Sequence, residues 1–420
     1  MNLEHFHSHK STGEDNNSFV GLKVIGNEIH FYYPESYRFD SASFEPGDIW
    51  ELLNTISIAK SVSDDKVSAY DSTHLDNDSA LLSCRWLIRD YITNGVPVYW
   101  NKNYIVNGSG RINWKRTLKQ QPIISKGNLL FKELITEIVR PEDAIIVDAY
   151  KYCLYLSIRL LGWLFNIDAG TMEIDPNSEA RRDEYLYAIT SELEKTFNDD
   201  RRLRINHMRS ILVGLDVICD EQHLVYGVNK YHYVFERMID RMFGTEDVRG
   251  YYPKFEWSLK YPTELSGLSG PTLRPDTIMR GGNDIYIIDS KFYRYGSLDL
   301  SKTKGLPEAA SIVKQIAYGS YVRDLLAIRE PEQRHRVYNV FVLPYDSQGF
   351  NASAVACENK DLVCIGYVSS EGNEKTERVY TFLIDLRNVV RKWNANSHNS
   401  EMKLLIEQII NQLEKESPPN

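Results

Sequence analysis

The sequence predicts an α/β protein whose C-terminal half forms a mixed β-sheet flanked by helices, preceded by an N-terminal α+β region. Two observations carry this prediction. The run Ile285–Ile288 is apolar without interruption, which is typical of a strand buried on both faces of a sheet. After residue 223, segments with helical spacing alternate with short strand-like runs, in the order helix, strand, hairpin, helix and strand.

The composition is that of a folded globular protein, because hydrophobic residues make up 42% and charged residues 25% of the 420 residues. The net charge of −9 does not favour nucleic acid through bulk electrostatics, so DNA contacts would have to come from local basic patches. Five scattered cysteines without a Cys-x-x-Cys pair indicate a reducing compartment, no disulfides and no zinc site. The absence of an apolar signal segment predicts a cytoplasmic location and no membrane contact.

Three segments are expected: an N-terminal α+β domain over 1–125, a helical region over 126–222 and a catalytic domain over 223–420. In the first, residues 1–18 are polar and are expected to form a loose arm, with His5, His7 and His9 as tail residues rather than a metal site. A hairpin is expected about Gly26-Asn27. Apolar spacing then predicts these helices: 46–59, 81–92, 128–165 with a restart at Pro141, 179–197 and 200–218.

In the third segment, apolar residues at helical spacing predict a helix over 231–243 that ends at Gly244. The remaining elements expected here are a strand at 255–259, the hairpin described below, a helix at 307–328, strands at 337–343, 362–368 and 378–386, and a closing helix at 400–415.

A basic stretch interrupts this acidic chain, because residues 91–132 hold seven basic residues and no Asp or Glu. Aromatic residues are interleaved with them, so the stretch is a candidate phosphate-contacting surface. The alternative, a solvated loop with a few packed aromatic residues, stays open. The candidate DNA-binding residues are Lys102, Arg111, Lys115, Arg116 and Lys119.

The candidate site is built on a hairpin about Gly281-Gly282-Asn283-Asp284, with Asp276 at the head of its first strand. Asp289 and Lys291 end the second strand and leave the same face, since they are two residues apart. Two neighbouring carboxylates repel each other unless a cation lies between them. The spacing also occurs by chance, but a buried strand that ends in charged residues favours a functional reason.

These residues suit phosphodiester hydrolysis. Asp276 and Asp289 would hold Mg²⁺, for which Mn²⁺ could substitute, with the backbone carbonyl of Ser290 as third ligand. Lys291 would orient water and offset negative charge in the transition state.

Two further residues are candidates. Glu236, on the preceding helix, would be an outer acidic ligand unless it is an ordinary surface carboxylate. Gln315, on the following helix, would fix the lysine or DNA, and a purely structural role stays open. The sequence contains no phosphate-binding glycine loop and no His-Glu-x-x-His motif.

Pro275, Asp276, Asp289 and Lys291 resemble the PD-(D/E)xK nuclease core. The chain also resembles LlaJI-type restriction endonucleases, a family similar to the nuclease subunit of Mcr-type GTP-dependent restriction systems. The matching pieces are Gly110–Thr117, Tyr233–Glu236, Leu273–Asp276, Ile288–Tyr293 and Gln315–Tyr318.

The resemblance implies a Mg²⁺-dependent DNA endonuclease of a prokaryotic restriction system. It also implies an AAA+ GTPase partner subunit that recognises the double-stranded DNA, while this chain cuts. Two alternatives stay open: a stand-alone Type II-like enzyme, and a non-catalytic scaffold that bridges a motor to DNA.

Overall fold

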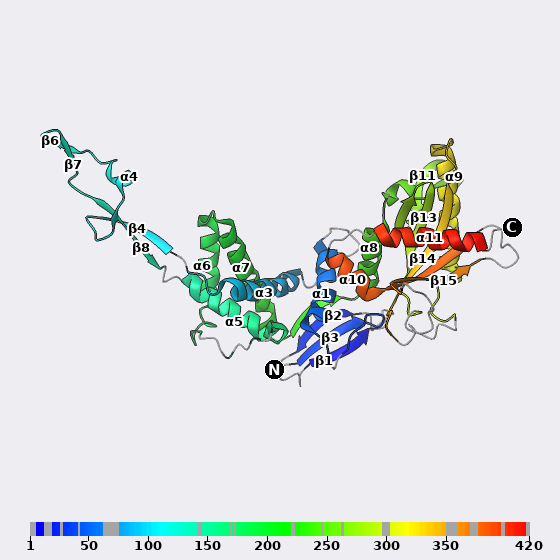
Figure 1. Cartoon of the computed structure of the whole chain (residues 1–420), viewed down its shortest axis with the longest axis horizontal. Helices are drawn as coiled ribbons and strands as arrows, with labels where there is room; N and C mark the ends of the chain where they lie inside the picture. Colours follow the sequence, from blue (N-terminus) through cyan, green and yellow to red (C-terminus); the bar gives the residue numbers. More distant parts are fainter. Residues whose placement is uncertain are drawn as a thin grey trace. The chain divides into compact units, whose positions relative to one another are not determined.

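The chain is a mixed α/β protein with several sheets and helices (Figure 1). The computed structural model describes residues 6–11, 19–25, 28–40, 43–61, 75–98, 100–141, 145–165, 167, 170, 174–219, 223–245, 247–261, 264–295, 303–349, 360–369, 377–395 and 400–416. It has two compact units, one over 75–221 and the other over 2–74 together with 222–420. The three domains expected from the sequence, over 1–125, 126–222 and 223–420, are a statement about which parts fold independently, and that division stays a prediction.

The second unit contains a five-stranded mixed sheet in the order β12-β13-β14-β16-β15. Strands β13, β14 and β16 are parallel, whereas β12 and β15 are antiparallel to their neighbours. All seven residues of β13 are buried, which confirms the prediction of a strand covered on both faces. The bounds are β12 (Thr277–Gly281), β13 (Asp284–Ser290), β14 (Arg336–Tyr345), β15 (Leu362–Val368) and β16 (Val379–Asp385).

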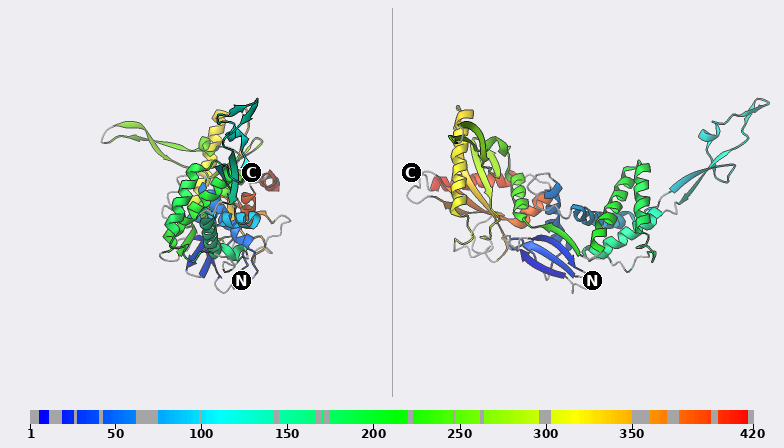
Figure 2. Two further views of the ribbon diagram at one scale, coloured as in Figure 1. Left: turned by 90° about the vertical axis from the view of Figure 1, so that its left-hand side faces the viewer. Right: turned by 180° about the vertical axis from the view of Figure 1, so that it is seen from behind.

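Four helices pack on this sheet: α8 (Tyr231–Phe243), α9 (Ala309–Arg329), α10 (Leu386–Asn394) and α11 (Ser400–Glu416). Helix α9 covers one face of the sheet (Figure 2). On that face Tyr318, Val322 and Leu326 form a core cluster with Ile285 and Ile287 of β13. Burial of such side chains contributes roughly 1.5–3 kcal/mol each. The sequence predicted α8, α9 and α11 but missed α10.

A four-stranded sheet in the order β1-β3-β2-β9 also belongs to the second unit, and helix α1 (Pro46–Ser61) packs on it. The strands are β1 (Phe6–Ser11), β2 (Val20–Ile25), β3 (Glu28–Pro34) and β9 (His223–Val228). The expected loose arm is therefore wrong for residues 6–11, because β1 pairs in parallel with β3 and places His7 beside His30. The rest of 1–18, including His5, lies outside the described residues.

A separate hairpin joins η4 (Val248–Tyr251) to the five-stranded sheet. It consists of β10 (Lys254–Leu259) and β11 (Leu265–Thr272), which form a two-stranded sheet. All six residues of β10 are exposed, and the hairpin stands out from its unit in the left view of Figure 2.

The first unit is built on four packed helices: α3 (Leu75–Asn94), α5 (Ile145–Phe165), α6 (Arg182–Lys195) and α7 (Asp199–Cys219). A partly buried ion pair joins α7 to α3 in this bundle, since Arg204 Nε lies 2.7 Å from Asp90 Oδ2. Among the described residues, no helix combines the length and apolar character needed to cross a membrane.

An extended arm completes the first unit. It contains β4 (Trp100–Val106), β5 (Arg111–Ile112), α4 (Trp114–Thr117), β6 (Ile123–Ser125), β7 (Asn128–Leu130) and β8 (Ile135–Pro141). The helix expected over the first part of 128–165 is therefore wrong up to Pro141. The β-branched residues of β8 pair with β4, and that long-range pairing outweighs the helical spacing of the leucines.

Candidate active site

The register of one hairpin brings the two candidate aspartates together. Thr277 of β12 pairs with Ile288 of β13, so Asp276 lies opposite Asp289 at the open end of the hairpin. The backbone N–H of Ser290 donates to Asp276 Oδ2 at 3.0 Å, which fixes this arrangement. The turn requires a glycine at its tight point, because Gly282 has φ +61°.

Lys291 is paired with the aspartate of its own strand. Its Nζ lies 2.6 Å from Asp289 Oδ2, and the two side chains are 17% and 3% exposed. The backbone N–H of Lys291 donates to the carbonyl of Val342 at 2.9 Å, so the lysine still belongs to the sheet edge. The pair is therefore largely shielded from water, and its electrostatic interaction is stronger than that of an ion pair on an open surface.

The charges at this edge perturb one another. Burial, followed by the negative charges of Asp289 and Glu236, raises the pKa of Asp276 well above its usual range. Burial by itself lowers the pKa of Lys291, but the carboxylate of Asp289 more than offsets this, and the pKa lies above the usual lysine value. The site thus combines a carboxylate that resists ionisation with an ammonium that stays charged at neutral pH.

Helix α8 adds two groups to this edge. Glu236 acts on the charge of Asp276, which places the two carboxylates within electrostatic range. His232 lies one helical turn before Glu236, and burial together with the charges of Lys230 and Lys291 lowers its pKa. The sequence analysis did not single out His232, although its i, i+4 spacing to Glu236 was a usable signal.

Gln315 of α9 is tied to the sheet rather than to the lysine. Its side chain is 1% exposed, and its Nε2 donates to the carbonyl of Ile287 at 2.6 Å. Tyr318, one turn further along α9, is within electrostatic range of the acidic pair, since burial and then the charges of Asp289 and Asp276 raise its pKa.

The donor set fits a hard cation such as Mg²⁺. Within the described chain, the buried polar atoms without a hydrogen-bond partner include Asp289 Oδ1, Ser290 Oγ and Gln315 Oε1. No three His, Cys, Asp or Glu side chains of the described ranges form a ready set of metal ligands. Mg²⁺ is usually held by only one or two carboxylates and keeps several waters, so an incomplete protein set is what this ion needs.

The basic residues of the arm lie in the first unit. Lys102 is in β4 opposite Val139, and Arg111 is in β5 opposite Glu137. Lys115 and Arg116 are exposed on α4, and Lys119 is exposed just beyond it.

The Gly110–Thr117 piece owes its shape to close packing on β8. A Cβ at Gly110 would lie 2.3 Å from the carbonyl oxygen of Glu137. Asn113 Nδ2 donates to Glu137 Oε2 at 3.1 Å, and Thr117 Oγ1 accepts from the N–H of Ile135 at 3.1 Å. The short helix α4 is thereby anchored with its basic side chains outward.

Fold and geometry define a mixed α/β protein whose candidate site joins acidic side chains to a partly buried lysine at the end of a hairpin. The family model described as LlaJI restriction endonuclease matches residues 19–365. The chain belongs to the LlaJI restriction endonuclease family, and that family implies nuclease activity in a restriction system.

Among the solved structures similar to the chain is the refined half-complex from a tetradecameric assembly of Thermococcus gammatolerans McrB AAA+ hexamers with bound McrC. The sequence identity is 14% and the TM-score is 0.36, over 90% of this chain and 82% of that chain. A likeness at this level does not establish a shared partner. No curated protein matches the chain.

Proposed function

We propose that the chain is a Mg²⁺-dependent DNA endonuclease of the PD-(D/E)xK type, acting in prokaryotic defence from the cytoplasm. The observation that carries the proposal is the placement of Asp276 opposite Asp289, with Lys291 Nζ 2.6 Å from the second carboxylate. Membership of a restriction endonuclease family supports the same reaction class.

In this mechanism the carboxylates of Asp276 and Asp289, with the backbone carbonyl of Ser290, would hold the cation. When bound, Mg²⁺ would polarise a phosphoryl oxygen as a Lewis acid. Lys291 would direct its ammonium toward the scissile phosphate and stabilise the negative charge that develops there. Its raised pKa supports this role, because the group remains charged at the pH of the reaction.

Glu236 and Gln315 would act around this centre. Glu236 would be the outer acidic ligand, and its electrostatic reach to Asp276 supports that position. Gln315 would act through the backbone, since its hydrogen bond to the carbonyl of Ile287 holds the strand two residues before Asp289. It is therefore proposed as a group that positions the site rather than one that touches DNA.

We further propose that an AAA+ GTPase is the partner and that the arm of the first unit meets DNA or this partner. Lys102, Arg111, Lys115, Arg116 and Lys119 would supply positive charge for phosphates. The large apolar side chains exposed on the same arm favour a protein contact over nucleic acid alone: Trp114, Leu118, Ile123, Ile124, Leu129 and Leu130. A stand-alone Type II-like enzyme would cut without GTP, and a scaffold would not cut at all.

The test is cleavage of mixed genomic DNA with Mg²⁺, alone and with GTP and the GTPase encoded beside the chain. Asp289→Asn should abolish cleavage, because it removes a cation ligand and the partner of Lys291. Asp284→Asn is the matched control, because Asp284 is a buried carboxylate at the other end of β13, paired with Arg336. If Asp289→Asn cuts as well as Asp284→Asn, the assignment is wrong.

A further inference from the structure

The chain that leaves β13 after Lys291 is fastened to the four-stranded sheet. Arg294 Nε lies 2.7 Å from Glu35 Oε2, and the Nη2 atom of the same arginine lies 3.2 Å from Oε1. This is a two-point guanidinium–carboxylate pair, the strongest geometry for such a contact. Glu35 directly follows β3, and its N–H donates to the carbonyl of Ser11 in β1 at 3.1 Å.

Phe292 makes a second attachment on the way. Its ring centroid lies 5.6 Å from that of Tyr231 and 5.3 Å from that of Phe235, at steep angles that suit aromatic pairs. The Tyr231 hydroxyl lies 3.1 Å from Thr55 Oγ1, and both residues are buried. Phe292 therefore packs on two side chains of α8, the helix that carries Glu236, and one of them, Tyr231, meets Thr55 of α1.

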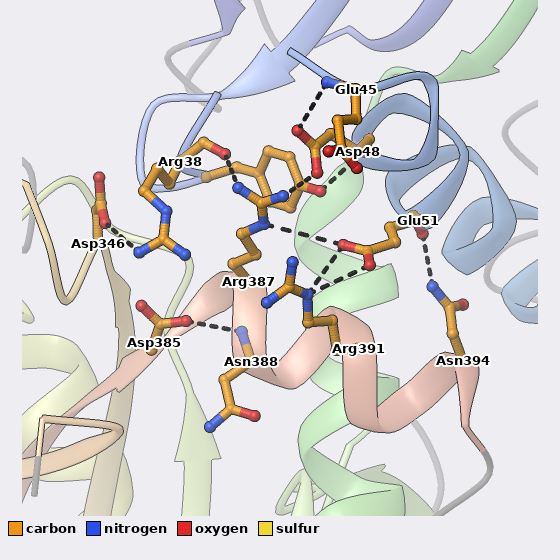
Figure 3. Close-up of polar contacts among 11 residues, drawn as sticks. Arg38, Glu45, Asp48, Glu51, Asp346, Asp385, Arg387, Asn388, Arg391 and Asn394 are labelled. Atoms are coloured by element: carbon orange, nitrogen blue, oxygen red, sulfur yellow. Dashed lines mark hydrogen bonds and ion pairs between the residues drawn. The ribbon is translucent and has the colours of Figure 1, made fainter. Parts of the chain in front are cut away.

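Helix α1 itself is held to the five-stranded sheet through α10 (Figure 3). Arg387 bonds the carboxylate of Asp48, and Arg391 Nε lies 3.2 Å from both carboxylate oxygens of Glu51. Asn394 Nδ2 donates to the carbonyl of Glu51 at 2.8 Å. Arg294 thus meets a residue at the end of β3 in the four-stranded sheet, on which α1 packs, and Phe292 packs on α8. Both of these helices are connected to the five-stranded sheet, α1 through α10 and α8 directly.

These contacts bear on the lysine through chain geometry. Lys291 is adjacent to Phe292 and three residues before Arg294, so a shift of this segment moves its Cα. Its long side chain has several rotatable bonds, and holding the ammonium against Asp289 depends on a fixed backbone. A misplacement of about 1 Å at a catalytic group can reduce a rate about 100-fold.

We infer that Phe292 and Arg294 are positioning residues for Lys291. Through Glu35, the four-stranded sheet is then part of the framework that holds the active site. The inference rests on the proposed function only for the role of Lys291 in cleavage. The placement of the lysine itself is a separate property, so it is measured separately.

The experiment compares two ion pairs of one kind. Arg294→Gln breaks the pair with Glu35, whose two side chains are 33% and 25% exposed. Arg280→Gln breaks the pair with Glu330, which has the same 2.7 Å distance and exposures of 26% and 29% but starts near the turn end of the hairpin. The expected result is a fall in kcat of about tenfold or more for Arg294→Gln with KM for DNA unchanged, and no change for Arg280→Gln.

Two further measurements complete the design. The exchange variant Glu35→Arg/Arg294→Glu should recover most of the lost kcat, since the pair is rebuilt with its charges reversed. Labelling of Lys291 by an amine-reactive acetylating reagent, quantified by mass spectrometry, should rise several-fold in Arg294→Gln and stay constant in Arg280→Gln.

Each result decides one idea. If Lys291 is labelled equally in both variants, the positioning role is refuted even if cleavage changes. If kcat falls equally in both, the loss is one of general stability and the inference is also refuted. If the wild-type protein cuts no DNA under any condition, the proposed function fails, whereas the labelling still shows whether Arg294 places the lysine.

Discussion

Replacement of Lys291 by Met should destabilise the protein strongly, because it leaves a buried carboxylate without its counter-charge. Asp289 is 3% exposed, its Oδ2 is 2.6 Å from the ammonium, and its Oδ1 has no hydrogen-bond partner in the described chain. Removal of one member of a buried ion pair costs about 3–5 kcal/mol. For a unit of this size that corresponds to a fall in Tm of roughly 6–20 °C.

The pH of the measurement follows from the pKa of the lysine. A folded-state pKa raised above the unfolded value means that the pair stabilises fully below the ordinary lysine pKa, and that this contribution is lost as the pH rises through the raised value. Neutral pH therefore captures the whole effect. Thermal and urea unfolding are measured with a chelator present, which keeps divalent cations from compensating the unpaired carboxylate of Asp289.

A double-variant cycle separates the energy of the ion pair between Asp289 and Lys291 from the effect of losing the lysine side chain. Asp289→Asn/Lys291→Met removes both charges and should be far more stable than Lys291→Met alone, since a buried ion pair can be replaced by neutral groups at little cost. Lys304→Met, at an exposed lysine, is the control and should change stability by less than about 0.5 kcal/mol. Equal loss in Lys291→Met and Lys304→Met would refute the reasoning.

Three further predictions follow from the same geometry. Asp276→Asn should raise the free energy of unfolding of the metal-free protein at neutral pH by about 1–2 kcal/mol, measured by urea unfolding. The reason is that the raised pKa of the Asp276 carboxyl makes its ionisation destabilise the fold as the pH rises above the unfolded-state pKa; unchanged or lower stability would contradict this. Mg²⁺ should raise the Tm of the wild type but not of Asp276→Asn, measured by scanning calorimetry. Lys115→Glu/Arg116→Glu should leave Tm unchanged but weaken partner or DNA binding and flatten its salt dependence, measured by titration at several salt concentrations.

Local patterns predicted the elements that local chemistry dictates. The helix expected over 231–243 has those bounds, and the hairpin about Gly282 is present, since turn residues and an unbroken apolar run are short-range signals. Helix α10 was missed although its buried residues, Leu386, Val389, Val390 and Trp393, have the i, i+3, i+4, i+7 spacing of a helix. The segment is short and follows β16 directly, and its start depends on Asp385, whose Oδ1 accepts from the N–H of Asn388 at 2.7 Å.

Strands that depend on distant partners were the main errors. Residues 6–11 are polar enough to resemble a tail, and they form a strand because β3 lies beside them. Ile135 and Ile138 suit a helical period as well as a strand, and pairing with β4 decides between the two. In both cases the deciding energy lies in contacts with residues far along the chain, which a short window does not contain.

The sequence by itself determined which chemical groups stand at the end of the hairpin, because Asp276, Asp289 and Lys291 follow from the order of residues around one turn. Only the tertiary structure decided what surrounds them. Glu236 and His232 reach this edge from α8, and Arg294 meets Glu35 across a separation of 259 residues. Such contacts arise from the packing of whole elements, whose register and distance are set by the folded core and not by the spacing of residues along the chain.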